Sequence, residues 1–334
     1  MFYKYDMDVD SKDKKILYEL EYDARKPLSE IARNVKIPKQ VVGYRIKKMT
    51  ENGVIRGFRA LVDTHRLGYF SYRIYIRFQN VTPENENALF RKLSNWKNVL
   101  WMVAITGRWD LEVVLVARNS IHFSALLLEL KNEVGRYMKE CEVSASIVNY
   151  HFKRKYLIEK YVEERIIPRY GFEPKIEKID ETDFRLLKLL SGNAAASYTL
   201  LGEKMGLTYN GVKKRMKSLE SRGVVQAYRT WLDLDKVGRK FYKALVSVSK
   251  FDQNIEKALL SFCLSEPGIV YLVECTGSWD IEIEAEVKDE MEFRGLLTRF
   301  RNSFKEIVKD YEILHGYKEL KLDYLPFEKY ERSL

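Results

Sequence analysis

Residue types that support catalysis or metal binding are sparse in this 334-residue chain, which has four histidines and three cysteines. No CxxC, HExxH, GxSxG or Walker-type phosphate loop occurs, so neither a zinc cluster nor a familiar catalytic constellation is predicted. We therefore expect no enzyme activity, no metal and no cofactor. The scattered residues are His65, His122, His151, His315, Cys141, Cys263 and Cys275.

Basic and polar residues gather instead on two predicted helices. Val42, Ile46 and Met49 recur at i, i+4 and i+7 and form one buried stripe, so the opposite face is exposed. A second segment repeats this pattern with Val212 and Met216. The candidate DNA contacts on these helices are Lys39, Gln40, Tyr44, Arg45, Lys47 and Lys48, then Tyr209, Asn210, Lys213, Lys214, Arg215 and Lys217.

Two interpretations of these faces stay open, a DNA contact and an ordinary solvated helix surface. Lysine and arginine would hold phosphates, whereas Gln, Asn or Tyr would reach base edges. Arg45 and Arg215 have a further alternative, because each stands beside the buried stripe within reach of an acidic neighbour, Asp13 or Asp183.

The elements around these helices resemble a winged helix-turn-helix. Helical spacing begins at Ser11, a short second helix covers residues 28–35, and a third runs from near Pro38 to Gly53. An extended segment, VIRGFRALVD, follows as the wing. Arg56 and Arg59, with Arg229 at the matching position later in the chain, are predicted to contact DNA from the wings.

The chain repeats itself at a constant offset of 170 residues. The offset places Asp10 on Asp180, and the segment TGRWDLE at residues 106–112 on TGSWDIE at residues 276–282. One offset kept over about a hundred residues implies two copies of one unit, roughly residues 9–152 and 179–322. A charged connector with Pro168, Gly171 and Pro174 separates them, and we expect it to be helical or extended.

After its helical part each copy alternates strands and helices in the order βαββαβ, which predicts a ferredoxin-like sheet with both helices on one face. The fold class is therefore α+β, as two tandem copies of a winged helix-turn-helix followed by a ferredoxin-like sheet domain. The predicted boundaries are 1–64 and 65–152 for copy one, 153–178 for the connector, and 179–234 and 235–325 for copy two.

The net charge of +10 favours a polyanionic partner such as double-stranded DNA. Residues 1–170 hold all of the excess, with 31 Lys and Arg against 21 Asp and Glu, while residues 171–334 hold 27 of each. The longest apolar runs are far short of the ~20 residues that cross a bilayer. We expect a cytoplasmic protein without a membrane contact.

The arrangement resembles the Lrp/AsnC family of transcriptional regulators, here in a tandem duplicated form. The openings DSKDKKIL and DETDFRLL, the two helix-turn-helix segments and the two TGxWD turns carry the resemblance. It implies DNA binding, a sheet domain that builds dimers, and an amino-acid or related effector near the Gly-x-x-Asp turn. The matching effector residues are Thr106, Gly107, Asp110, Thr276, Gly277 and Asp280. A hairpin that needs glycine and an aspartate cap explains these residues equally well.

Copy one departs from the family pattern at the starts of its second and third helices. Pro27 and Pro38 replace the serines that family members often place there, whereas copy two keeps Ser197 and Thr208. Such hydroxyls often contact phosphates, so copy one is expected to grip DNA differently. The duplication itself implies a covalent pseudo-dimer within one chain, which we expect to assemble further into a homo-oligomer.

The open sheet faces differ between the copies. Alternation along one strand puts Asp280, Glu282, Glu284 and Glu286 on one face. We hypothesise that the two open faces pack together and that Arg73 and Arg77 of copy one compensate this acidic stripe, selecting the pairing of unlike copies. A solvated acidic strand is the alternative. A cation site is less favoured, because neighbours on one strand face lie ~6 to 7 Å apart.

Two other functions fit the same architecture. Siroheme decarboxylases share it, but the Trp-Pro-Tyr-Asn segment that we associate with them is replaced here by TGRWD, and His65 and His122 do not form a catalytic pair. A module that has lost DNA binding and only binds an effector or assembles is the other alternative. The basic helices in both copies argue against it.

Overall fold

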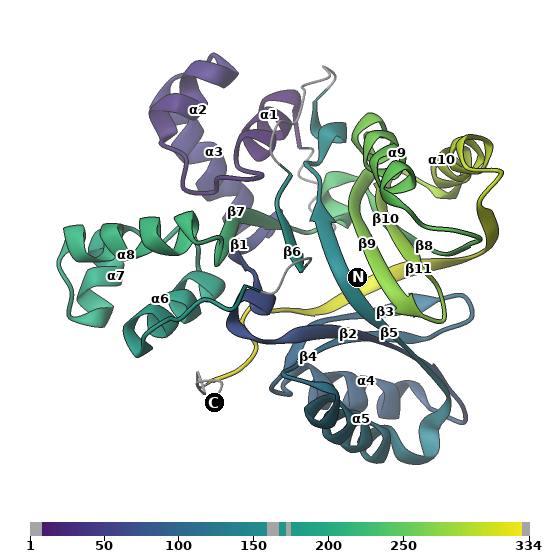
Figure 1. The fold of residues 1–334 in the computed structure, drawn as a ribbon. Helices are drawn as coiled ribbons and strands as arrows, with labels where there is room; N and C mark the ends of the chain where they lie inside the picture. The colour runs from purple at the N-terminus through teal and green to yellow at the C-terminus, as the bar shows by residue number, and fades with distance from the viewer. Residues whose placement is uncertain (1–8, 159–166, 172–174, 329–334) are drawn as a thin grey trace.

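The computed structural model describes residues 9–158, 167–171 and 175–328. Copy one opens with three helices, α1 (Ser11–Glu19), α2 (Leu28–Val35) and α3 (Lys39–Glu51). Copy two opens with α6 (Glu181–Gly192), α7 (Tyr198–Met205) and α8 (Tyr209–Ser221). We call these three-helix units the first and second heads. Both lie at one end of the molecule, away from the helices that cover the sheet (Figure 1).

The starts of α1 and α6 follow from their aspartates. Asp10 accepts hydrogen bonds from the backbone N–H groups of Lys12 and Asp13, and the Asp13 carboxylate accepts one from the Asp10 N–H in return. Asp180 accepts from the N–H of Asp183 in the same way. These caps satisfy backbone donors that have no partner within the helix, and they set where each head begins.

The segment after each third helix is a single strand, not a ribbon of its own. These strands, β1 (Ile55–Val62) and β7 (Val225–Leu232), pair with each other in antiparallel fashion, with Arg59 opposite Arg229. The two predicted wing segments are thus the two strands of one shared ribbon. One strand cannot satisfy its own backbone groups, and the equivalent strand of the other copy supplies the missing partner.

The two sheet units have the predicted order. Copy one runs β2 (Phe70–Phe78), α4 (Pro83–Ser94), β3 (Val99–Thr106), β4 (Leu111–Ala117), α5 (Ser120–Val134) and β5 (Met138–His151). Copy two runs β8 (Lys240–Val248), α9 (Gln253–Ser265), β9 (Ile269–Gly277), β10 (Ile281–Val287), α10 (Glu290–Ser303) and β11 (Val308–Leu322). The fold class is α+β, with ferredoxin-like sheets as expected.

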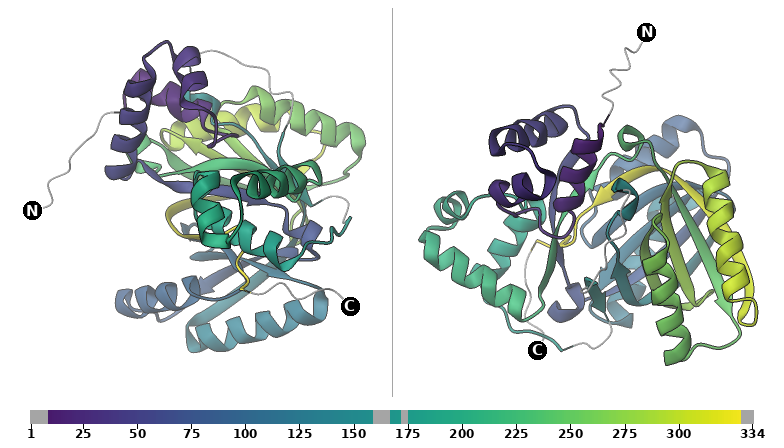
Figure 2. Two further views of the ribbon diagram at one scale, coloured as in Figure 1. Left: turned by 90° about the vertical axis from the view of Figure 1, so that its left-hand side faces the viewer. Right: turned by 90° about the horizontal axis from the view of Figure 1, so that it is seen from above.

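The two sheets join edge to edge into a closed ring of strands. β3 pairs with β11 at one seam and β5 pairs with β9 at the other, giving the order β2, β4, β3, β11, β8, β10, β9, β5, with β5 returning to β2. Closing the ring removes exposed sheet edges, which are otherwise sites of aggregation. Figure 2 shows the two sheets from two further directions.

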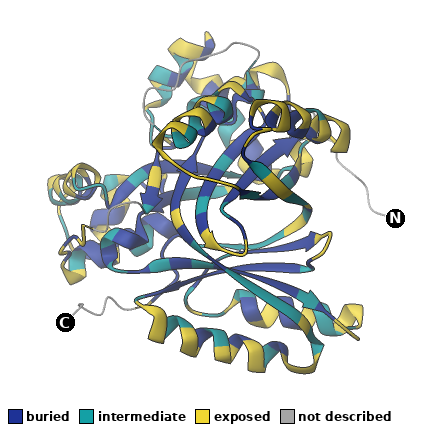
Figure 3. Ribbon diagram, turned by 45° about the vertical axis from the view of Figure 1, so that its right-hand side comes forward, coloured by how far each residue is buried: buried dark blue, intermediate teal, exposed yellow. Residues whose placement is uncertain are grey.

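Alternation along the strands separates a helix-facing side from a side that faces the interior of the ring. Ile281, Ile283 and Val287 of β10 pack with α9 and α10, while Ile74 and Ile76 of β2 pack with α4 and α5. The opposite residues of these strands face the other copy, and burial extends across this interior (Figure 3). Each sheet is thus covered on both faces, by its own helices and by the other sheet.

Part of the connector lies beside β5. Residues Arg169–Gly171 form the short strand β6, which pairs with β5, and Lys155–Leu157 form one 3-10 turn. Residues 159–166 and 172–174, which include Pro174, lie outside the described residues. No helix within the described ranges is long and apolar enough to cross a membrane.

The turn between β9 and β10 requires glycine. Gly277 has φ +143°, and an added Cβ would lie 2.7 Å from the carbonyl oxygen of Val143 on the neighbouring copy. We predict that Gly277→Ala lowers the free energy of unfolding by about 2 kcal/mol. Gly192→Ala, where an added Cβ meets nothing within 4 Å, is the control and should change it by less than about 0.5 kcal/mol. Urea denaturation of both variants measures the difference, and equal midpoints would contradict the prediction.

Candidate functional site

The faces of α3 and α8 that point away from the heads' own cores are exposed as predicted. In copy one the exposed residues are Lys39, Gln40, Tyr44, Lys47 and Lys48. In copy two Tyr209, Asn210, Lys214 and Lys217 are exposed and Lys213 is half-buried. The opposite stripe, including Val42, Met49, Val212 and Leu219, is buried within each head. The two helices therefore present polar, mostly basic surfaces to a partner.

The two heads differ at the helix starts. In copy two the Ser197 hydroxyl accepts from the Leu200 N–H at 3.1 Å, and the Thr208 hydroxyl accepts from the Gly211 N–H at 3.1 Å. Pro27 and Pro38 of copy one make no side-chain cap. The first head consequently leaves more backbone N–H groups without a side-chain cap at the starts of α2 and α3.

Arg45 and Arg215 are engaged inside their own heads. Arg45 donates to Asp10 at 2.7 Å and to Asp13 at 2.9 Å, and Arg215 donates to Asp180 at 2.8 Å and to Asp183 at 2.7 Å. The equivalent pairing in both copies fixes α3 against α1 and α8 against α6. These arginines serve the heads' internal packing, which is the alternative that their acidic neighbours suggested.

The three arginines of β1 and β7 differ in exposure, and Arg56 is the most exposed of them. Arg229 is only 3% exposed, and Arg59 is half-buried, with its guanidinium 4.8 Å from the ring centre of Trp231. Arg56 stacks on the same ring at 4.2 Å and lies 3.5 Å from the Glu319 carboxylate. Arg229 is therefore too buried to contact DNA as a wing residue, whereas the predicted DNA contacts of the exposed Arg56 and the half-buried Arg59 stay predictions.

The Gly-x-x-Asp turns lie at the seams between the copies. The Asp110 carboxylate accepts from the backbone N–H of Phe78 at 2.6 Å, and Asp280 accepts from that of Val248 at 2.7 Å. Both carboxylates thus join the turn to the first strand of the same sheet. Thr106 and Gly107 border a hollow of about 280 Å³ that copy two completes with Tyr242 and His315.

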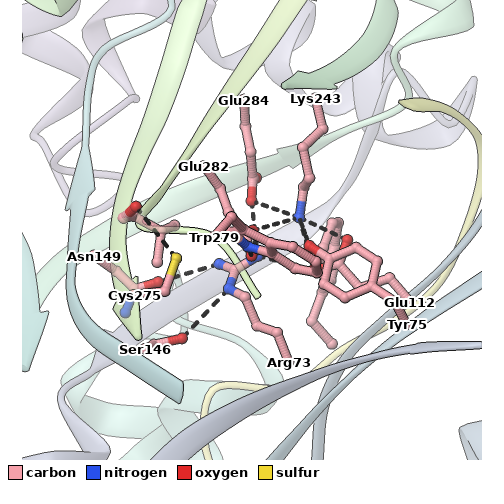
Figure 4. A network of polar contacts seen from close by, with 12 residues as sticks. Arg73, Tyr75, Glu112, Ser146, Asn149, Lys243, Cys275, Trp279, Glu282 and Glu284 are labelled. Carbon is pink, nitrogen blue, oxygen red and sulfur yellow. Dashed lines mark hydrogen bonds and ion pairs between the residues drawn. The ribbon is translucent and has the colours of Figure 1, made fainter. Parts of the chain in front are cut away.

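Charged residues of both copies meet in the interior of the ring (Figure 4). Arg73 of copy one lies 2.9 Å from each of the carboxylates of Glu112, Glu282 and Glu284. Lys243, its counterpart in copy two, lies 2.6 Å from Glu112 and 2.9 Å from Glu282. We call these five side chains the ring cluster. All are buried, and each cation bridges carboxylates from both copies.

The electrostatics of the ring cluster distinguish its carboxylates. Burial alone would raise the pKa of Glu282, but Arg73 and Lys243 outweigh it and hold that pKa below its ordinary value. Burial dominates at Glu112 and raises its pKa. Two cations among three carboxylates leave one negative charge in excess. The raised pKa of Glu112 favours its neutral form, which would remove that excess.

The other two interface candidates lie elsewhere. Arg77 is 41% exposed in its side chain, and its ion pair among the described residues is with Glu140 of its own copy at 3.4 Å, so its predicted role in the interface is wrong. Arg77 lies opposite Glu140 in the pairing of β2 with β5. Glu286 instead pairs with Arg154, at 2.8 Å, at the start of the connector just after β5. The repeat itself identifies Lys243 as an interface residue, because the 170-residue offset aligns it with Arg73.

A second buried network ties the first head to the ring. Glu21, just after α1, accepts hydrogen bonds from Arg154 at 2.7 Å and from Arg229 at 3.0 Å. Arg154 also donates to Glu286, and Arg229 lies 2.9 Å from Nδ1 of His151. No sequence motif predicted this network, because its members are scattered single residues: Glu21 follows α1, His151 ends β5, Arg154 follows β5, and Arg229 and Glu286 lie in β7 and β10.

A cavity of about 420 Å³ lies at the mouth of the ring, between the ring and the β1–β7 ribbon. Basic side chains outnumber acidic ones along its lining, and several aromatic rings face it. His151 and His315, two of the four histidines, are both on this lining. We call it the mouth cavity.

Comparison with known proteins places the chain in a family. The model of a winged helix-turn-helix DNA-binding family, HTH_24, matches residues 9–56 and again residues 179–226. The leucine-responsive regulatory protein of Rhizobium meliloti is 32% identical over 37% of this chain and 80% of its own length. The chain belongs to the Lrp/AsnC family. The regulatory protein AsnC of Haemophilus influenzae is 29% identical over 36% of this chain and 79% of its own length.

These Lrp/AsnC relatives correspond in length to one copy, whereas two solved structures of a siroheme decarboxylase match both copies together. The siroheme decarboxylase NirDL superposes with a TM-score of 0.60 at 16% identity, covering 96% of this chain and 95% of that one. At this identity the match shows a shared fold alone.

The ring cluster gives a direct stability prediction. Arg73→Met leaves buried glutamates with one cation fewer and should lower the free energy of unfolding by about 3 to 5 kcal/mol. Arg77→Met removes one exposed ion pair of the same strand and should cost less than about 1 kcal/mol. Urea unfolding followed by circular dichroism compares the two variants. Equal losses would show that the ring cluster is not a determinant of stability.

The burial of His151 predicts a dependence of stability on pH. Burial and the neighbouring charge of Arg229 hold its pKa well below the ordinary value of 6.5. The unfolded chain therefore takes up a proton near pH 6.5 that the folded chain refuses, so this contribution to stability is lost as the pH falls. Relative to His151→Gln, the wild type should lose about 2 kcal/mol between pH 7 and pH 5. Parallel pH profiles of the two unfolding free energies would refute this.

Proposed function

We propose that the protein is a sequence-specific regulator of transcription that binds double-stranded DNA as a covalent pseudo-dimer. The observation that carries the proposal is the pair of exposed basic helices, α3 and α8, held at one end of the molecule by a shared ribbon and a closed ring. Its Lrp/AsnC relatives include HTH-type transcriptional regulators. A DNA partner also implies a cytoplasmic location.

In this proposal each third helix lies in a major groove. The lysines of α3 and α8 neutralise phosphates, while Gln40, Tyr44 and Asn210 are in position to reach base edges. Arg45 and Arg215 hold the helices at the required angle from within the heads. The β1–β7 ribbon fixes the distance between the heads, so the spacing of the two half-sites is set by the fold.

We further propose that an amino acid or related effector acts at the Gly-x-x-Asp turns. The residues available to it are the exposed Thr106 and Gly107, with Thr276 and Gly277 in copy two. Because Asp110 and Asp280 are engaged with backbone N–H groups, they would shape this site instead of contacting the effector. We also propose that further assembly of the pseudo-dimer uses the exposed surface around these turns.

DNA binding is tested by reversing charge on the two helices. Lys47, Lys48, Lys213 and Lys214 are changed together to glutamate, and affinity for labelled genomic fragments is measured by fluorescence anisotropy at two salt concentrations. We expect at least a 100-fold loss of affinity and a smaller salt dependence, because phosphate contacts are removed.

The matched control carries the same four charge reversals on the sheet side of the molecule. Lys131, Lys257, Lys305 and Lys309 are exposed residues outside the heads. Their change to glutamate should alter affinity less than the head variant does. Equal losses of affinity in both variants would show that binding depends on net charge alone. Unchanged binding by the head variant would refute the proposed interface.

The divergence of the heads predicts an asymmetric target. The first head has Gln40 and no side-chain caps at the starts of α2 and α3, whereas the second has Asn210 and hydroxyl caps at the starts of α7 and α8. Selection of bound fragments from a random pool should therefore yield unequal half-sites, separated by one or more helical turns. Enrichment of perfect palindromes would contradict specialisation of the heads.

A second candidate function is favoured by the chain-long similarity to a siroheme decarboxylase. That enzyme has been solved with an iron-uroporphyrin III analogue, and here the mouth cavity carries two histidines and several arginines. An absorbance titration of this protein with iron uroporphyrin III tests it. A saturable shift of the Soret band would support the enzyme, and an unshifted spectrum would oppose it.

A further inference from the structure

Three nitrogens from almost fully buried side chains of the mouth cavity's lining residues have no hydrogen-bond partner among the described residues. They are Nδ2 of Asn149, Nε2 of His151 and Nε of Arg229. The three residues are 2 to 3% exposed, so the atoms are screened from bulk solvent. Leaving a buried polar atom unsatisfied costs about 1 to 3 kcal/mol, so three on one wall indicate a recognition surface.

All three nitrogens are donors. The Arg229 guanidinium cannot accept a hydrogen bond, so the 2.9 Å contact between its Nη1 and Nδ1 of His151 requires Nδ1 to accept. The ring proton of the neutral histidine must then sit on Nε2, which turns this atom into a donor. Asn149 uses its Oδ1 to accept from Arg73 at 3.1 Å, which leaves its Nδ2 group as the free donor.

The donors converge because of the strands that carry them. Asn149 and His151 are two residues apart on β5, so their side chains share one face. Arg229 reaches the same wall from β7 and contacts His151 directly. A ligand with two acceptor oxygens a short distance apart fits this arrangement.

The acidic residues of the lining already have partners. Glu286 is bonded by Arg154 and Tyr156, and Glu284 is paired with Arg73 and Lys243. Glu319 accepts from the indole N–H groups of Trp101 and Trp231. The unpartnered groups of the buried wall are therefore donors, which require a ligand with hydrogen-bond acceptors. The excess of basic residues along the lining favours a negatively charged ligand.

Aromatic rings surround the donor wall. The ring centre of His151 lies 4.8 Å from that of Tyr271, 5.3 Å from that of Tyr170 and 6.3 Å from that of Tyr324. Flat aromatic walls favour a planar apolar body, which can stack or pack edge to face. A volume of about 420 Å³ lies within the range of small-molecule sites.

We propose that the mouth cavity binds a small aromatic carboxylate, with its carboxylate on Asn149, His151 and Arg229 and its ring among the three tyrosines. This site is separate from the Gly-x-x-Asp turns at the seams. It does not depend on DNA binding, because it is built from the ring and the ribbon.

The probe is 4-fluorobenzoate, with 4-fluorobenzamide as its uncharged counterpart, and binding to the full chain is followed by 19F NMR. We expect saturable binding of the benzoate at least tenfold tighter than that of the benzamide. Equal affinities would overturn the proposed charge recognition. Absence of binding by the benzoate would show that water alone meets the three donors, and would also overturn the proposal.

The decisive variant is Asn149→Asp, which keeps an oxygen to accept from Arg73 and replaces the free donor with a negatively charged acceptor. We expect at least a tenfold loss of 4-fluorobenzoate affinity. Asn302→Asp adds the same charge on the exposed surface of α10 and should leave the affinity unchanged. Equal affinities in the two variants would refute the site.

A second variant tests the proposal if Asn149→Asp does not fold. His151→Phe keeps an aromatic ring among the tyrosines and removes the Nε2 donor, and should also weaken 4-fluorobenzoate at least tenfold. Folding of both variants is checked by their circular dichroism. A folded His151→Phe protein that binds the probe like the wild type would contradict the proposal.

Discussion

The rest of the structure depends on one exchange of charge inside the strand ring. Arg73 of the first copy lies among glutamates of the second, and Lys243 of the second lies on Glu112 of the first. Charges removed from water are stable only when their partners are near, so neither open sheet face can be buried without the other. Two copies of the second kind would bring additional carboxylates together, because Glu284 corresponds to Val114 in the first copy. The ring cluster therefore favours the pairing of unlike copies, which the covalent connection makes possible.

The heads inherit their placement from this pairing. β1 and β7 each lack a partner within their own copy and find one in the other, so the position of both heads follows once the ring has closed. Glu21 then connects the first head to Arg154 and Arg229 at the mouth of the ring. These contacts give the first head a buried polar attachment to the ring, in addition to the ribbon that it shares with the second.

Duplication within one chain also removed the need for symmetry. In an assembly of identical subunits every cavity residue appears twice, but here Asn149 and His151 of one copy correspond to Glu319 and Lys321 of the other. The mouth cavity consequently has a donor-rich wall beside His151, and Glu319 elsewhere on its lining is bonded to two indoles. The same freedom explains why the second head keeps its hydroxyl caps while the first has prolines.

The sequence by itself determined the elements that depend on local patterns. The 170-residue repeat, the helices with their buried stripes, and the βαββαβ order follow from periodicity that neighbouring residues impose on one another. It also indicated that Arg45 and Arg215 had acidic partners within reach, and that β10 carries its carboxylates on one face. Only the tertiary structure decided where the arginines of β1 and β7 point, that Arg77 lies outside the interface, and that Lys243 lies within it. It alone brought Asn149, His151 and Arg229 onto one wall. These outcomes depend on contacts between residues far apart in the chain, which strand pairing creates and which no local spacing encodes.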